Sequence, residues 1–174
     1  ICGTDRNYLL SHGENPVTKE QHDAYLSSIE KRRRHIPLQH ILGYQEFMGL
    51  KFQVTPQVLI PRQDTETLVE EVLRFLHDGM HILDVCTGSG CILLSLLRYS
   101  NDCVDISGEA LKVADKNAAA LGIEAEFIQS NLFENIDGKY EIIVSNPPYI
   151  ASGEIPGLME EVREHDPLMA LDGG

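Results

Sequence analysis

The chain has 174 residues, of which 43% are hydrophobic, and its formal net charge at pH 7 is −13. This length can bury one substantial core and a smaller appendage, and so much negative charge argues against a surface that binds nucleic-acid phosphates. No stretch is apolar enough to span a bilayer and no signal peptide is visible, so we expect a soluble cytoplasmic enzyme without a membrane partner.

The four cysteines show no C-x-x-C spacing, and three of them lie in apolar strand or helix contexts. We therefore expect buried thiols and not a disulfide framework or a zinc site. The histidines are scattered among turn and surface positions, so we assign no residue to a metal.

Residues 7–40 have a helical pattern, in which Thr18 and Gln21 form a capping box and Pro37 ends the run. The basic residues 31–35 allow two interpretations: a solvated helix end favoured by the macrodipole, or a docking patch for an acidic partner. We favour the first, because charge runs are commonly solvated faces. Glu160, Glu161 and Glu164 are interpreted in the same way, as the solvated face of a helix.

The period of the apolar residues changes between positions 45 and 60. Phe47, Phe52 and Val54 alternate in a way that predicts a short β-hairpin turning near Gly49. Asp64 is then expected to cap a helix, whose apolar stripe is Leu68, Val69, Val72, Leu73 and Leu76.

The rest of the chain alternates between strands and helices. Strands are expected at residues 81–85, 103–106, 126–128 and 141–145, and helices at 90–99 and 109–121, the second entered at Ser107 and stopped by Gly122. This alternation predicts an α/β fold with a parallel, doubly wound sheet.

A glycine turn follows the first of these strands. Gly88 and Gly90 tolerate positive φ and let the backbone approach a ligand closely. A dinucleotide site would have a third glycine where this chain has Leu93, so the turn favours a nucleoside without a phosphate to cradle. Asp84 lies near the expected path of a positively charged ligand, and Asp105 is placed to accept hydrogen bonds from ribose hydroxyls.

Asn146, Pro147, Pro148 and Tyr149 follow the apolar strand at residues 142–145, at the end where open α/β sheets bind ligands. The two prolines fix φ twice and remove two backbone donors, which leaves carbonyl acceptors on a stiff turn. With one side-chain acceptor from Asn146 and the ring of Tyr149, this turn suits a planar –NH2 group.

These motifs together resemble those of the HemK/PrmC-type release factor glutamine methyltransferases, which methylate the glutamine side-chain amide of the Gly-Gly-Gln motif in peptide chain release factors. The similarity extends from about Tyr8 to the last residue. The matching segments are the interdomain element at 59–66, the S-adenosylmethionine loop at 83–90, the ribose-binding strand end at 104–107, the adenine-flanking segment at 129–133 and the catalytic signature at 144–150.

The resemblance implies a Rossmann-like S-adenosylmethionine-dependent methyltransferase sheet, expected to be incomplete in this chain because the family has further strands. It divides the chain into a helical substrate-recognition domain (1–44), a β-hairpin linker (45–63) and a methyltransferase domain (64–174). Three departures stand out: Cys86 where the family usually has glycine, Gln63 where it usually has proline, and a stretch from Arg98 to Asp105 that is a few residues shorter than in the family.

The resemblance also implies the cofactor, S-adenosyl-L-methionine, and the partner, a peptide chain release factor. It assigns catalysis and substrate binding to Asn146, Pro147, Pro148 and Tyr149, with Arg62 as a further substrate-binding residue. The residues assigned to the cofactor are Asp84, Cys86, Thr87, Gly88, Ser89, Gly90, Asp105, Ile106, Asn131, Leu132 and Asn146.

Two alternatives remain open at this point. An adenine –NH2 presents the same two donors, so the chain could be an adenine-amino DNA or RNA methyltransferase, although its charge and the lack of a visible target-recognition segment speak against this. A cofactor-binding regulatory module without catalysis would be expected to lose the signature at 146–149, which is intact.

Overall fold

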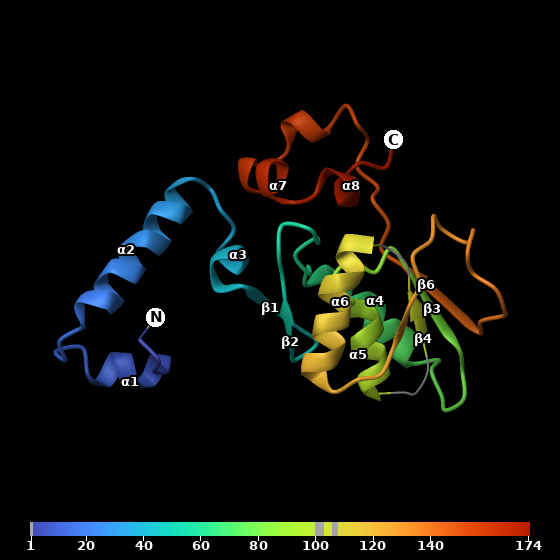
Figure 1. Ribbon diagram of the computed structural model, residues 1–174, viewed down its shortest axis with the longest axis horizontal. Coiled ribbons are helices and arrows are strands. Elements are labelled where there is room, and N and C mark those ends of the chain that lie inside the picture. The colour runs from blue at the N-terminus through green and yellow to red at the C-terminus, as the bar shows by residue number, and fades with distance from the viewer. Residues whose placement is uncertain (1, 100–102, 106–107) are drawn as a thin grey trace.

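The computed structural model describes residues 2–99, 103–105 and 108–174 (Figure 1). Its first part is helical: α1 (Arg6–Ser11), α2 (Lys19–Arg33) and α3 (Leu38–Leu42). The predicted capping box is confirmed, since Thr18 accepts from the Gln21 N–H and the Gln21 side chain accepts from the Thr18 N–H. Pro37 does not simply end the helical run, because it lies at the N-cap of α3.

The predicted hairpin is confirmed as β1 (Tyr44–Phe47) paired antiparallel with β2 (Leu50–Gln53). Its two turn residues, Met48 and Gly49, have φ of 49° and 70°, as a two-residue hairpin turn of the primed type requires. Phe47 and Phe52 are buried and pack edge to face, with ring centroids 6.2 Å apart. The hairpin is thereby anchored in the main core.

Helix α4 (Asp64–Leu73) follows the hairpin, and its apolar stripe packs on the core around fully buried Val69. The expectation that Asp64 caps this helix is wrong. The helix begins one residue earlier than expected, with Gln63 at the N-cap and no side-chain capping bond, so Asp64 lies in the first turn. There its carboxylate still complements the positive end of the helix dipole.

A four-stranded parallel sheet forms the second part, with strand order β5-β4-β3-β6. The strands are β3 (Ile82–Val85), β4 (Cys103–Asp105), β5 (Glu126–Phe127) and β6 (Ile142–Ser145). Figure 1 shows α4, α5 (Cys91–Tyr99) and α6 (Gly108–Leu121) together on one side of these strands. The predicted α/β class is confirmed. The residue expected to enter α6, Ser107, lies outside the described residues.

The main core lies between the sheet and these helices. Its fully buried members include Ile82 and Leu83 on β3 and Leu93, Leu94 and Leu96 on α5. All four residues of β3 are buried because β4 and β6 flank this central strand. The carboxyl end of β3 is therefore a rigid place from which a ligand-binding turn can start.

The last part of the chain contains the short helices η1 (Ile155–Gly157), α7 (Glu160–His165) and α8 (Leu168–Leu171). In Figure 1 this segment lies between the N-terminal helices and the sheet. An isolated parallel bridge pairs Ile150 with Asp172, so the end of the described chain returns to the segment that follows β6.

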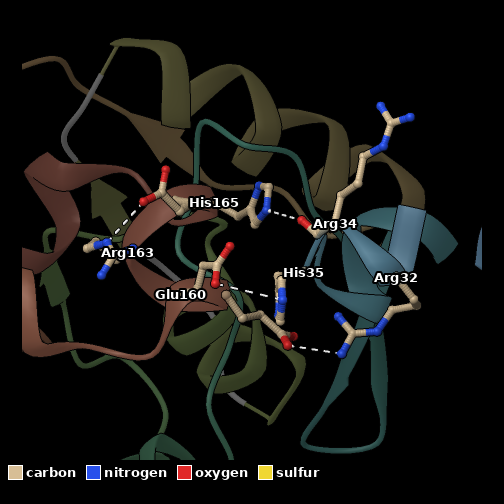
Figure 2. Close-up of polar contacts among 8 residues, drawn as sticks. Arg32, Arg34, His35, Glu160, Arg163 and His165 are labelled. Atoms are coloured by element: carbon tan, nitrogen blue, oxygen red, sulfur yellow. Dashed lines mark hydrogen bonds and ion pairs between the residues drawn. The ribbon is translucent and has the colours of Figure 1, made fainter. Parts of the chain in front are cut away.

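Helix α7 contacts the basic end of α2 (Figure 2). Arg32 pairs with Glu161 at 3.1 Å and the His35 ring lies 3.7 Å from a Glu160 oxygen. The His165 ring lies 3.3 Å from the Arg34 carbonyl oxygen. Glu160 and Glu161 are therefore not simply a solvated face, because both form contacts with the basic residues of the N-terminal part.

No helix among residues 2–99 and 108–174 combines the length and the apolarity that crossing a membrane requires. Within the described residues, no group of histidine, cysteine and acidic side chains could hold a metal ion. Cys91 is buried as expected, whereas Cys2 and Cys86 are only half-buried.

Candidate active site

A cleft of about 1260 Å³ opens at the carboxyl end of the parallel strands. It is larger than a typical pocket for one small molecule, which is about 300–1,000 Å³. Its walls come from the segment after the hairpin, the glycine turn, the loop after β5, the turn after β6 and the last segment of the chain. The predicted site residues that line it are Arg62, Cys86, Thr87, Gly88, Ser89, Asn131, Leu132, Asn146 and Pro148.

The glycine turn has the backbone that its sequence predicts. Gly88 and Gly90 have φ of 59° and 79°, and Cys86 also has a positive φ of 66°. A Cβ on Gly90 would lie 3.1 Å from both Ala114 Cβ and Leu94 Cδ1, so this glycine permits close packing of the turn on α6. Gly90 therefore supports the turn from behind and does not line the cleft.

Asp84 lies beneath the turn and not in the cleft wall. Its side chain is fully buried, and Thr87 Oγ1 donates to Asp84 Oδ2 at 2.7 Å. Burial raises the pKa of Asp84 to about 7, although the bond from Thr87 and the backbone N–H of Leu93 act in the opposite direction. The carboxyl group thus holds the turn through Thr87.

Asn117 is a site residue that the sequence analysis missed. It is fully buried on α6, and its Nδ2 donates to the Ser89 carbonyl at 2.9 Å and to the Gln53 carbonyl at 3.1 Å. Its Oδ1 accepts from the Gln53 N–H at 2.7 Å. One amide side chain therefore joins the glycine turn to the hairpin. The available signal was a polar residue at an apolar position of the stripe Ala110, Val113, Ala114, Asn117 and Ala118.

The turn after β6 is held against β3 by Ser145, whose hydroxyl donates to the Val85 carbonyl at 2.6 Å. Asn146 Nδ2 makes a long hydrogen bond of 3.5 Å to Thr65 Oγ1 at the start of α4. The Asn146 side-chain nitrogen thus faces Thr65 on α4. Pro148 lines the cleft, whereas Pro147 and Tyr149, the latter 80% exposed, lie outside its lining.

Arg62 lines the cleft but is engaged by the protein itself. Its Nη2 lies 2.5 Å from Asp166 Oδ2, and the Asp166 side chain is almost completely buried. Burial raises the pKa of Asp166, and the guanidinium beside it offsets part of that rise. This ion pair joins the segment after the hairpin to the last segment of the chain.

The remaining predicted residues lie around the loop after β5 and at the end of β4. Asn131 and Leu132 are exposed on the cleft wall, and Asn131 Nδ2 donates to Glu134. Asp105 ends β4 directly opposite Asp84 in the sheet register, so its backbone lies at the same edge as the glycine turn. Ile106 lies outside the described residues.

In this parallel sheet, a glycine turn follows β3 and an asparagine-proline turn follows the neighbouring strand β6. This arrangement defines a Rossmann-like methyltransferase fold. Solved methyltransferases have the same fold. A tRNA (uracil-54, C5)-methyltransferase of Pyrococcus abyssi aligns with a TM-score of 0.52 and 18% identity, over 60% of this chain and 28% of its own. A 16S rRNA N2 G1207 methyltransferase of T. thermophilus aligns with a TM-score of 0.50 and 21% identity, over 63% of this chain and 33% of its own.

The chain belongs to the methyltransferase small domain family, whose model matches residues 63–163. Residues 1–43 match the PrmC N-terminal domain. Relatives named release factor glutamine methyltransferase include those of Geobacter sulfurreducens, 42% identical over 99% of this chain, and Agrobacterium fabrum, 43% identical over its whole length. The predicted HemK/PrmC-type family is thereby confirmed. The chain spans 62% and 64% of the length of these two relatives.

Proposed function

We propose that the chain transfers a methyl group from S-adenosylmethionine to the side-chain amide nitrogen of the Gly-Gly-Gln glutamine in peptide chain release factors, and so supports translation termination. The observation that carries this proposal is the shared cleft, in which the glycine turn and Asn146 face the same space. The names of the relatives support it, as does the PrmC N-terminal domain match.

The cleft fits a nucleoside cofactor without phosphates. Among the described lining residues the charged side chains are Arg62, Glu109 and Lys112. Both cations are ion-paired, Arg62 with Asp166 and Lys112 with Glu109 at 2.6 Å, so neither is dedicated to a pyrophosphate. The glycine turn would hold the amino-acid end of the cofactor. We assign Asn131 and Leu132, with Asp105 and Ile106 on the ribose side, to the nucleoside end.

The turn after β6 would orient the substrate amide. Asn146 Oδ1 and the Pro147 carbonyl would each accept one N–H of the glutamine side chain, with the exposed ring of Tyr149 beside the entrance. The long bond from Asn146 Nδ2 to Thr65 Oγ1 supports this orientation, in which Oδ1 would face the substrate. Arg62 would act by holding the cleft wall through Asp166, and its remaining N–H groups could contact the substrate backbone.

The bound cofactor supplies a methyl group on a positively charged sulfur. Asn146 Oδ1 and the Pro147 carbonyl would orient the amide nitrogen toward that methyl group, which the cofactor would donate while its sulfur becomes a neutral thioether. Positive charge grows on the nitrogen, so the two hydrogen bonds that it donates to Asn146 and Pro147 strengthen in the transition state. The N-methylated, protonated amide is very acidic and releases its proton to water without a strong base.

An adenine-amino methyltransferase is less well supported. The chain carries a net charge of −13, and the amino-terminal region matches the PrmC N-terminal domain instead of a nucleic-acid-binding module. We also propose the division into a recognition domain (1–44), a hairpin linker (45–63) and a methyltransferase domain (64–174).

Mass spectrometry of a release factor after incubation with the enzyme and S-adenosylmethionine tests the proposal. We expect the mass of one methyl group on the peptide that contains Gly-Gly-Gln. The matched control is a release factor in which that glutamine is replaced by asparagine, whose shorter side chain should not reach the two acceptors. Methylation of adenine in DNA or RNA, with none on the release factor, would overturn the proposal.

A further inference from the structure

The segment at residues 166–174 lies directly against the turn that would orient the substrate. Ile150, the residue after that turn, donates its N–H to the Leu171 carbonyl at 3.0 Å and accepts from the Gly173 N–H at 2.9 Å. Together these bonds make the parallel bridge between Ile150 and Asp172. Both backbone polar groups of Ile150 are therefore paired by one short segment.

Gly173 packs so closely against the turn that any residue with a side chain would force the backbone to shift. A Cβ at this position would lie 2.8 Å from the Pro148 carbonyl oxygen and 2.9 Å from Tyr149 Cα. Both atoms belong to the backbone of a stiff proline turn, so they cannot move aside as a flexible side chain would. The contact requires the absence of a side chain.

The same segment is fixed at other points, so it cannot easily recede from the turn. Asp166 is held by Arg62, and Leu171 is buried with only 5% of its surface exposed. Asp172 Oδ1 accepts from the Ser152 hydroxyl at 2.7 Å, outside the segment, and also from the Gly174 N–H at 3.0 Å, within the segment itself. A side chain added at Gly173 would therefore displace Pro148 and Tyr149, and not the 166–174 segment alone.

We propose that Gly173 is a positioning residue for the methyl transfer reaction, because its close contact with Pro148 and Tyr149 fixes the turn that carries Asn146 and Pro147. This inference rests on the proposed function of that turn. The glycine turn at residues 86–90 starts from a different strand, and Asn146 is one of several residues assigned to the cofactor. Gly173 should therefore affect the orientation of the substrate amide much more than cofactor binding.

Gly173→Ala in the full chain tests the proposal, with Gly157→Ala as the matched control, because a Cβ at Gly157 would meet nothing within 4 Å. We expect Gly173→Ala to lower kcat for a glutamine peptide by about tenfold to a hundredfold, as a small misplacement of reacting groups can. The cofactor Kd from calorimetry should stay within about twofold, which separates misorientation from loss of the site. Gly157→Ala should match the parent in both quantities.

A second readout is independent of activity. Amide hydrogen exchange at Ile150 should be faster in Gly173→Ala than in the parent and in Gly157→Ala, because the N–H of Ile150 is bonded to the displaced segment. This measurement still tests the inference if the parent methylates no glutamine, an outcome that would overturn only the proposed function. Unchanged exchange at Ile150 in a folded Gly173→Ala chain would overturn the inference.

If Gly173→Ala does not fold, Asp172→Ala takes its place, because it removes the acceptor of Ser152 and Gly174 at a partly exposed site. It should lower kcat several-fold, with cofactor Kd unchanged. A parent-like kcat in the folded variant would contradict a positioning role for this segment.

Discussion

The side-chain amide of Asn117 donates to the carbonyl oxygen of Ser89 at 2.9 Å and thereby ties α6 to the glycine turn. The same side chain makes two further bonds to the backbone of Gln53, at the end of the hairpin. A buried amide whose two donors and one acceptor are all bonded rigidifies its surroundings, since each bond would cost free energy if lost. The glycine turn and the hairpin thus share one support.

Asn117→Asp should weaken both structures. The carboxylate still accepts from the Gln53 N–H, but it replaces two N–H donors and then faces the carbonyl oxygens of Gln53 and Ser89. We expect a loss of about 2–4 kcal/mol in the free energy of unfolding from the buried unsatisfied groups. Calorimetry should also show S-adenosylmethionine binding about tenfold weaker, as the turn loses its support.

Val69→Ala is the control for that experiment, because Val69 is fully buried on α4 and its apolar side chain cannot form a hydrogen bond to the turn. Val69→Ala should lower the free energy of unfolding by an amount similar to that of Asn117→Asp, because apolar contacts are lost. It should leave cofactor affinity unchanged. Equal cofactor affinities in Asn117→Asp and Val69→Ala would show that Asn117 supports only the fold.

Asp84 should give the stability of the chain a specific pH dependence. Its pKa in the folded chain is about 7, above the ordinary 3.8, because burial disfavours the charged carboxylate. The folded chain therefore binds this proton more tightly than the unfolded chain does. Its contribution to stability is fully present below about pH 4 and is lost as pH rises toward 7, by about 1.4 kcal/mol for each pH unit.

Urea unfolding of the parent and Asp84→Asn at several pH values measures this contribution. The asparagine oxygen can still accept from Thr87, but the side chain does not titrate. Between about pH 4 and pH 7, the parent should therefore lose stability relative to the variant. Parallel stability curves for the two chains over this interval would show that Asp84 does not hold a proton in the folded state.

Cys86 has φ of 66°, in the left-handed region that favours glycine. Cys86→Gly should therefore raise the free energy of unfolding by about 0.5–1 kcal/mol. This value is the relief of left-handed backbone strain, reduced by the greater conformational entropy that glycine gives the unfolded chain. Cys86→Ala is the control, because it removes the thiol and keeps the Cβ. If the glycine variant is no more stable than the alanine variant, the backbone at this position carries no strain.

The contact between α2 and α7 should contribute little to the chemistry. Arg32 and Glu161 are 40% and 35% exposed, and exposed ion pairs contribute about 0–1 kcal/mol. Replacing Arg32, Arg33 and Arg34 together with alanine should leave methylation of a short glutamine peptide intact. Loss of this activity in a folded variant would place the active site near α2. Loss on the whole release factor alone would identify a docking surface.

Local sequence patterns predicted the elements whose stabilising contacts join residues close together in the sequence. The capping box at Thr18 and the hairpin turn before Leu50 depend on residues within four positions of each other, and both were predicted correctly. The asparagine-proline turn could be placed at a strand end because an apolar run directly precedes it. Family resemblance added the assignment of both Asn146 and the glycine turn to the cofactor.

Long-range side-chain contacts could not be predicted in this way. Asn117 reaches Gln53 across 64 positions, and Arg62 reaches Asp166 across 104. The close approach of Gly173 to Pro148 likewise depends on how two distant segments meet in three dimensions. The cap assigned to Asp64 was wrong because helix starts shift by a residue without a strong sequence signal.

Asn146 is the residue on which turnover should depend most. Asn146→Ala removes one of the two acceptors that would orient the amide nitrogen, which costs roughly 3–4 kcal/mol of barrier, or about a hundred- to a thousandfold in rate. The Pro147-Pro148 turn and the bond from Ser145 to Val85 do not involve this side chain, so the fold should persist. Cofactor affinity should fall much less than the rate, because Asn146 is one of several residues assigned to the cofactor. Asn146→Asp keeps an acceptor and should retain partial activity, although a charge in a site for a neutral amide misorients the substrate.

The most direct measurement is the rate of methylation of the release-factor glutamine by the parent, Asn146→Asp and Asn146→Ala, with cofactor Kd determined on the same preparations. We expect rates to fall in that order, with the alanine variant nearly inactive, and the cofactor Kd to change much less than the rate. An alanine variant that methylates the glutamine at near the parent rate would contradict the proposed role of Asn146 and the mechanism built on it.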